Sequence, residues 1–252
     1  MLPTIIRAAC GTLFPFLMTF LGAATVFFFT GTPHPRFRQA MLGFAAGVMT
    51  AAAVWSLLIP AIDQSEALGI PGWFPAGVGL LLGAAFMAVM DLALLHLQNR
   101  QPMFPGSHSS ALLAAAITLH NIPEGMAVGL AFALAADSGL TAGAAALAMG
   151  IGIQNFPEGA AISLPLRQEG YSRRRACLAG AASGSVEPVF GILTVLFAAG
   201  AVALMPWLLS FAAGAMLYVI AEELIPQAHS KTGTCGFLLG FLIMMALDVA
   251  LG

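Results

Sequence analysis

Two short segments with nearly the same sequence decide how this chain folds: HNIPEG at residues 120–125 and QNFPEG at residues 154–159. Four of the six positions are identical, and both segments lie inside long apolar stretches. A proline lacks a backbone N–H, so the carbonyl four residues before it loses its helical partner. A glutamate and an unpaired carbonyl are costly in a bilayer unless they face a cavity, a neighbour or an ion. The repeat therefore predicts two kinked, carboxylate-bearing helices that form a cation site.

The composition around these segments is that of a membrane protein. Of 252 residues, 60% are hydrophobic and 8% are charged, and the mean hydropathy is +0.93. A soluble domain carries about 25% charged residues, so the composition argues against a soluble enzyme. The net charge of -2 provides no basic surface for nucleic acid. Three cysteines without a CxxC spacing predict neither a disulfide framework nor a thiolate zinc site.

The chain divides into eight apolar stretches, each close to the roughly 20 residues that a helix needs to cross a bilayer. Pro, Gly and polar residues typical of turns separate them. The first stretch is too long for the apolar region of a cleaved signal peptide, so we count it as a span. We expect one all-α polytopic membrane domain over residues 1–252, with spans at about 8–30, 39–62, 74–97, 109–134, 141–165, 176–199, 201–226 and 234–251.

The basic residues predict how the spans are oriented. The loops after the first, third, fifth and seventh spans hold eight of the nine Lys and Arg residues, and Arg7 is the ninth. Short loops rich in Lys and Arg stay on the cytoplasmic side. We therefore expect a multi-pass protein of the cell (inner) membrane with both termini on the outer side.

The two copies of the repeat have opposite orientations because they lie in consecutive spans. Inverted repeats that meet near the bilayer midplane are a recurrent plan of secondary transporters, with the substrate site at the repeat interface. Residues three and four apart share one face of a helix. The polar members of each copy are thus expected to point into one site: His120, Asn121 and Glu124 from the first, and Gln154, Asn155 and Glu158 from the second.

A third carboxylate, Glu187, lies at the centre of the sixth span, at the same expected depth as Glu124 and Glu158. Buried carboxylates repel one another, and no Lys or Arg is expected at this depth, so protons or a bound cation must compensate them. Imidazole and carboxylate ligands suit Zn²⁺, and oxygen-rich sites accept Mn²⁺ or Fe²⁺. Met49, near the centre of the second span, is either a soft additional ligand or apolar filling.

Further polar residues are ordered by depth on both sides of this centre. Ser56 and Asp63 lie toward the outer end of the second span, and Glu222 and Glu223 near the cytoplasmic end of the seventh. Such an order is expected of a cation pathway, while solvation of Asp63 in a loop and a dimer contact at Glu222 and Glu223 remain alternatives. Asp91 and Asp248 have no role on sequence grounds.

On these residues the sequence resembles the ZIP (ZRT/IRT-like) family of metal transporters, in its bacterial ZupT-like branch. The resemblance covers the whole chain and rests on the paired PEG motifs in the fourth and fifth spans. It implies a binuclear metal site on His120, Asn121, Glu124, Gln154, Asn155, Glu158 and Glu187. It also implies that Met49 is a ligand, that Ser56 and Asp63 form the entrance, and that Glu222 and Glu223 form the exit.

The resemblance implies uptake of Zn²⁺ into the cytoplasm, with Fe²⁺, Mn²⁺ and Cd²⁺ as further candidate substrates. It implies an elevator-like motion in which the first, fourth, fifth and sixth spans move against the others. We expect no prosthetic group; the partners are the transported metal, membrane lipid and, as a candidate, a second copy in a homodimer. Many family members have His where this chain has Gln154.

Other functional classes fit the sequence less well. A zinc protease would need a motif such as HExxH, which is absent. A serine mechanism has only His120 as a membrane-embedded partner, and a haem would need a second axial ligand. The chain is therefore not expected to be an enzyme. A proton-coupled carrier of another small solute remains the alternative, since buried acids can act as proton relays.

Overall fold

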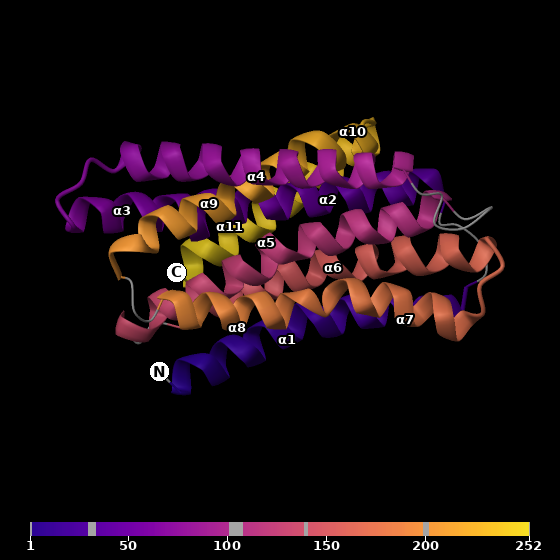
Figure 1. Ribbon diagram of the computed structural model, residues 1–252, viewed down its shortest axis with the longest axis horizontal. Helices are drawn as coiled ribbons and strands as arrows, with labels where there is room; N and C mark the ends of the chain where they lie inside the picture. The colour runs from indigo at the N-terminus through magenta and orange to yellow at the C-terminus, as the bar shows by residue number, and fades with distance from the viewer. Residues whose placement is uncertain (1, 30–33, 101–107, 139–140, 199–201, 252) are drawn as a thin grey trace.

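The apolar stretches of the sequence are helical in the computed structural model, which describes residues 2–29, 34–100, 108–138, 141–198 and 202–251. No strand occurs among these residues. The helices run back and forth along one long axis, and both termini lie at the same end of the bundle (Figure 1). The proposed breaks near Pro102 and Gly200 lie outside the described residues.

The helices form two groups, each packed mainly on itself. The α1 group contains α1 (Leu2–Ala24, followed by the 3-10 turn η1, Thr25–Phe27), α5 (His108–Ser138), α6 (Ala142–Gln168), α7 (Arg173–Gly184) and α8 (Val186–Ala198). The α2 group contains α2 (Pro35–Ala52), η2 (Ala53–Leu58), α3 (Ile59–Ala67), α4 (Trp73–Arg100), η3 (Val202–Leu204), α9 (Met205–Val219), η4 (Ile220–Leu224), α10 (Ile225–Ala228) and α11 (Lys231–Leu251).

The groups meet where α5 packs on α9 and where α6 packs on α2 and α11. Buried alanines, among them Ala45, Ala46 and Ala127, lie in the core that joins them. Small side chains let helices approach closely in a membrane, where apolar surface alone gives little drive for association. The two polar motifs lie on α5 and α6, so both are at or near this contact.

Six helical stretches of the described chain are long and apolar enough to cross a membrane: 2–27, 35–67, 73–96, 173–198, 205–228 and 231–251. The protein is therefore a multi-pass membrane protein by length and composition. α5 and α6 are longer than several of these but do not belong to the six. They are the helices that carry the polar motifs, whose side chains lower the mean hydropathy.

One expected span is interrupted. The sequence predicts a single helix over 176–199, but α7 ends at Gly184 and α8 begins at Val186. Pro188 supplies the reason, because its missing N–H leaves the carbonyl of Gly184 without a helical partner. The interruption places Glu187 in the first turn of α8.

Two further spans contain a π-helical segment that the sequence analysis did not foresee. In η2 the N–H of Ile59 donates to the carbonyl of Val54, and in η4 that of Ile225 donates to Ile220. Each segment is followed by a proline, at Pro60 and Pro226, which cannot donate to the residue four before it. Widening the helix to five-residue bonds accommodates that loss, and such bulges are frequent at functional sites.

Candidate metal centre

A chain of buried side chains joins α5, α6 and α8. The Gln154 Nε2 donates to Glu124 Oε1 at 2.6 Å and to Asn155 Oδ1 at 3.1 Å. The Asn155 Nδ2 in turn donates to Glu187 Oε1 at 3.0 Å. These hydrogen bonds bring side chains of both motifs and Glu187 together, and their role as metal ligands stays a prediction.

Two more contacts tie this centre to its surroundings. The Asn121 Nδ2 donates to the carbonyl of Ser183 at 3.0 Å, which fixes α5 beside the end of α7. The Thr19 hydroxyl donates to Glu187 Oε1 at 3.5 Å, a long hydrogen bond from α1. Because the donors come from separate helices, the carboxylates are held by the packing of the whole α1 group.

The carboxylate and amide oxygens of this centre that lack a hydrogen-bond partner can all act as acceptors. Among the described residues, several buried oxygens of this centre have no hydrogen-bond partner: Asn121 Oδ1, Glu124 Oε2, Gln154 Oε1, Glu158 Oε2 and Glu187 Oε2. Buried polar atoms are normally paired, and leaving one unpaired costs about 1–3 kcal/mol. No basic side chain within the described part forms an ion pair with Glu124, Glu158 or Glu187. Acceptors without donors fit a cation.

The glycines of both motifs have a packing role. A Cβ on Gly125 would overlap the carbonyl of Glu187, and one on Gly159 would overlap the carbonyl of Thr19. These close approaches bring α8 against α5 and α1 against α6. The PEG sequence thus combines a proline, a carboxylate and a contact surface in three successive residues.

A second acidic group adjoins the first on the side of the α2 group. The His120 Nε2 lies 3.2 Å from Glu223 Oε1. Ligand atoms of Asp91, His120 and Glu223 all lie within 4.8 Å of one another. His120 is one helical turn from Glu124 on α5, so it connects this group to the buried carboxylates.

Asp91 was missed as a site residue by the sequence analysis. It lies on α4, far in sequence from both motifs, and no local pattern links it to His120. The signal available was the charge itself, because an ionisable residue within an apolar span marks a functional site by default. Glu222, which the sequence analysis placed at the exit together with Glu223, is exposed.

Polar residues also pair at the other π segment. The Ser56 hydroxyl in η2 donates to Asp248 Oδ1 on α11 at 2.6 Å. Asp248 is buried and its Oδ2 has no partner. Asp63 is exposed on α3. Met49 is buried within the apolar core.

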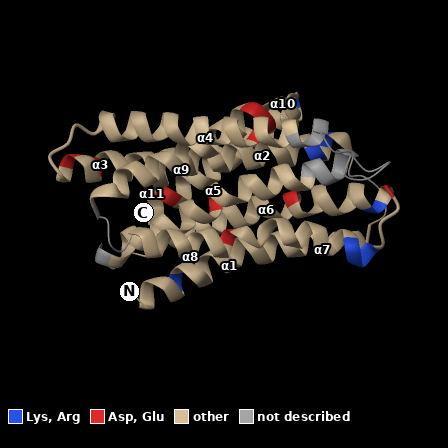
Figure 2. Cartoon of the chain, viewed as in Figure 1, with Lys and Arg blue, Asp and Glu red and all other residues tan. Residues whose placement is uncertain are grey.

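Charge is distributed unevenly along the bundle. Figure 2 shows the Lys and Arg residues gathered mainly at the end opposite the termini, with acidic residues along the interior. The fold and the site together define a class of protein: an all-helical, multi-pass membrane protein with unpaired acidic groups at its core.

Comparison with known proteins identifies the family. The model of the family described as "ZIP Zinc transporter" matches residues 96–248. The chain is 36% identical to zinc transporter ZIP11 of Homo sapiens, covering 99% of this chain and 98% of that protein. It is 40% identical to zinc transporter GufA of Myxococcus xanthus (79% and 81%), and 37% to zinc transporter ZIPB of Bordetella bronchiseptica (86% and 72%). The chain belongs to the ZIP family, as its motifs predicted.

Proposed function

We propose that this protein carries Zn²⁺ across the cell membrane into the cytoplasm and catalyses no chemical reaction. The observation that carries the proposal is the set of unpaired, buried oxygen atoms on Glu124, Glu158 and Glu187. Three carboxylates in apolar surroundings without a basic partner need a cation or protons to compensate them. The names of the related zinc transporters favour zinc as that cation.

The proposed ligands fall into two neighbouring sets, which allows two ions to be bound. The first set binds the metal through side-chain oxygens and consists of Asn121, Glu124, Asn155, Glu158 and Glu187. The second set contains the imidazole of His120, the amide of Gln154 and, as a soft ligand, the thioether of Met49. Carboxylate and imidazole are normal zinc ligands. Glutamates shared between the sets would bridge two metals.

The proposed pathway leads through both π segments. Ser56 and Asp63 form the entrance, which Asp248 extends through its hydrogen bond to Ser56. Glu222 and Glu223 form the exit, and Asp91 joins them through its position beside Glu223. We propose further that the α1 group moves against the α2 group as an elevator. Contacts within each group outweigh those between them, which supports this division.

The proposed function is tested by metal uptake into proteoliposomes that contain the purified protein and a trapped zinc indicator. We expect saturable Zn²⁺ entry, with Fe²⁺, Mn²⁺ and Cd²⁺ compared as competitors and Mg²⁺ as a control cation. Mg²⁺ should compete poorly, because it demands octahedral oxygen coordination and dehydrates reluctantly. Liposomes that take up no divalent metal, while an organic solute enters with protons, would support the alternative carrier instead.

The orientation can be tested independently of transport. Counting α5 and α6 as spans gives eight crossings, and the basic residues then place both termini outside. A reporter that is active only in the cytoplasm should stay inactive when it is fused after Gly252. The same reporter inserted in the loop at residues 169–172 should be active. An active C-terminal fusion would show that the number of spans is odd or that the orientation is reversed.

Substitution of Gln154 by histidine should tighten zinc binding. Gln154 lies between Glu124 and Asn155, and its Oε1 is an unpaired acceptor. Imidazole is a better zinc ligand than an amide oxygen and is less suited to hard cations. We therefore expect a lower apparent KM for Zn²⁺ and a higher Zn²⁺/Mn²⁺ preference in competition uptake. An unchanged ratio would show that residue 154 does not touch the metal.

Uptake should slow in acid. Zinc ligands must be deprotonated, so protons compete with the metal for carboxylate oxygens and for imidazole. Lowering the outer pH from about 7 to about 5 moves through the range in which imidazole and clustered carboxylates gain protons. We expect the apparent KM for Zn²⁺ to rise across this range. Uptake that keeps increasing as the pH falls would indicate proton coupling.

A further inference from the structure

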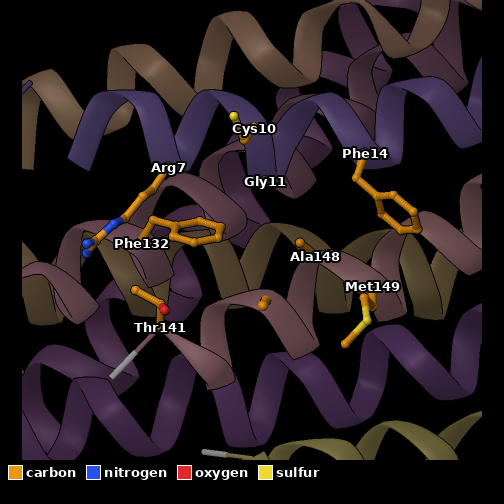
Figure 3. Close-up of a pocket in the computed structure, with 9 residues that line it drawn as sticks. Arg7, Cys10, Gly11, Phe14, Phe132, Thr141, Ala148 and Met149 are labelled. Atoms are coloured by element: carbon orange, nitrogen blue, oxygen red, sulfur yellow. The ribbon is translucent and has the colours of Figure 1, made fainter. Parts of the chain in front are cut away.

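A cavity lies outside the acidic centre, between α1, α5 and α6. It has a volume of about 370 Å³ and opens to the surface of the bundle. Figure 3 shows Arg7 and Thr141 at one end of it and Phe14 and Met149 at the other. Its remaining lining residues are Cys10, Gly11, Phe132, Ala145 and Ala148. None of these lining residues belongs to the proposed metal centre or to the proposed pathway.

Helix geometry makes the cavity a groove with a polar end. Arg7, Cys10, Gly11 and Phe14 follow the spacing of one helix face. From Arg7 to Phe14 the helix rises by about 10 Å, enough for a segment of an acyl chain. Across the groove, Thr141 precedes the first turn of α6, and its side chain makes no capping hydrogen bond.

Two aromatic rings seated over glycines give the groove fixed walls. A Cβ on Gly11 would overlap the ring of Phe132, and one on Gly152 would overlap the ring of Phe14. Both rings are thus held against a neighbouring backbone. A groove whose walls are set by such contacts is formed before any ligand enters, as is usual for binding sites.

Arg7 has a special place in the charge distribution. Among the basic side chains that the structure describes, it alone belongs to the end of the bundle that holds the N-terminus. It is exposed and takes part in none of the ion pairs of the described chain. A cation at a membrane surface attracts anionic lipid headgroups. The long aliphatic stem of Arg lets the charged group reach the interface while the stem lies on apolar surface.

We propose that the groove between α1, α5 and α6 binds one glycerophospholipid with an anionic headgroup. The Arg7 guanidinium and the Thr141 hydroxyl bind the phosphate, and one acyl chain lies along Gly11, Ala145 and Ala148 between the two rings. An empty apolar groove would forfeit dispersion contacts that a chain restores. The single cation selects an anionic over a zwitterionic headgroup. This site is separate from the metal centre, so it does not depend on the proposed transport.

Two native cysteines allow lipid binding in the groove to be measured by thiol labelling. Cys10 is exposed and lines the groove, whereas Cys235 is exposed on α11, in the other helix group. The experiment follows the rate at which a small maleimide labels each thiol in the detergent-solubilised full chain. Phosphatidylglycerol, phosphatidylcholine and glycerol phosphate are added in separate arms. Glycerol phosphate has the charge without the acyl chains.

Phosphatidylglycerol should slow the labelling of Cys10 and leave that of Cys235 unchanged. Arg7→Gln should raise the concentration needed for half-protection by about fivefold, the effect of one basic residue at an anionic surface. Arg7→Lys should retain most of the protection. Arg38→Gln, at an exposed arginine of α2, is the matched control and should behave as the unmodified chain.

Several results would overturn the proposal. Equal protection by phosphatidylcholine would show that the headgroup charge does not decide which lipid binds. Protection by glycerol phosphate alone would show that the site binds a free anion. Full protection in Arg7→Gln would exclude the arginine from the site. Protection that depends on protein concentration without lipid would place a second copy of the chain on the groove. A thermal unfolding curve for each variant checks that it is folded.

Discussion

Replacing either Glu124 or Glu158 by alanine is expected to abolish zinc uptake while the protein stays in the membrane. Both carboxylates are buried, both have an unpaired Oε2, and they occupy matched positions of the repeated motif. Loss of groups that only orient metal ligands already costs about 10–100-fold in affinity or activity. Loss of a carboxylate that binds the ion itself should reduce the initial uptake rate by at least the upper value.

Controls separate loss of the ligand from loss of the fold. Glu66→Ala removes an exposed carboxylate on α3 and should leave uptake unchanged. Glu124→Gln and Glu158→Gln keep the shape and one oxygen acceptor but remove the charge, so they should be folded and nearly inactive. Uptake is measured in proteoliposomes at equal protein content. A normal rate in either alanine variant would refute the assignment of the metal centre to these glutamates.

The repeated motif predicts which polar side chains share a helix face, because that information is local in the sequence. Residues three and four apart on a helix share a face whatever surrounds them. In the structure Gln154 donates hydrogen bonds to Glu124 and Asn155, while metal binding by these residues stays a prediction. Glu187 could be added from its depth in an apolar stretch, since a buried carboxylate needs compensation.

Other parts of the site could not be read from the sequence because they depend on contacts between distant helices. Asp91 meets Glu223 only because α4 packs on α9. Asp248 pairs with Ser56 because α11 lies along α2. Nothing in the residues near Asp91 or Asp248 specifies those neighbours. Because their neighbours in space could not be inferred, Asp91 and Asp248 had no assigned role on sequence grounds.

The hydropathy of the sequence does not reveal the two π-helical segments. η2 and η4 lie within apolar stretches that read as continuous helices, and only the Ile-Pro step after each marks them. Ser56 and Glu222 lie four residues before those prolines, so their carbonyls lose an α-helical partner. The same prolines thus widen the backbone at both residues proposed for the ends of the metal pathway.

The second large effect, on both stability and zinc uptake, is expected from Gly159→Ala, which adds a single methyl group. A Cβ there would overlap the carbonyl of Thr19, so Gly159→Ala must push α1 away from α6. Overpacking of this kind costs about 1–3 kcal/mol. Thr19 also donates to Glu187, so the shift would move a donor away from the metal centre. We expect a lower thermal unfolding temperature in detergent together with slower zinc uptake.

Gly77→Ala provides the matched control for this substitution. Gly77 lies within α4, and no atom lies within 4 Å of a Cβ built on it. Alanine favours a helix over glycine by about 1 kcal/mol at exposed interior positions. The same chemical change should therefore leave stability unchanged or raise it at Gly77 and lower it at Gly159. Equal unfolding temperatures for the two variants would contradict the close approach of α1 and α6, and with it the role assigned to the last residue of the PEG motif.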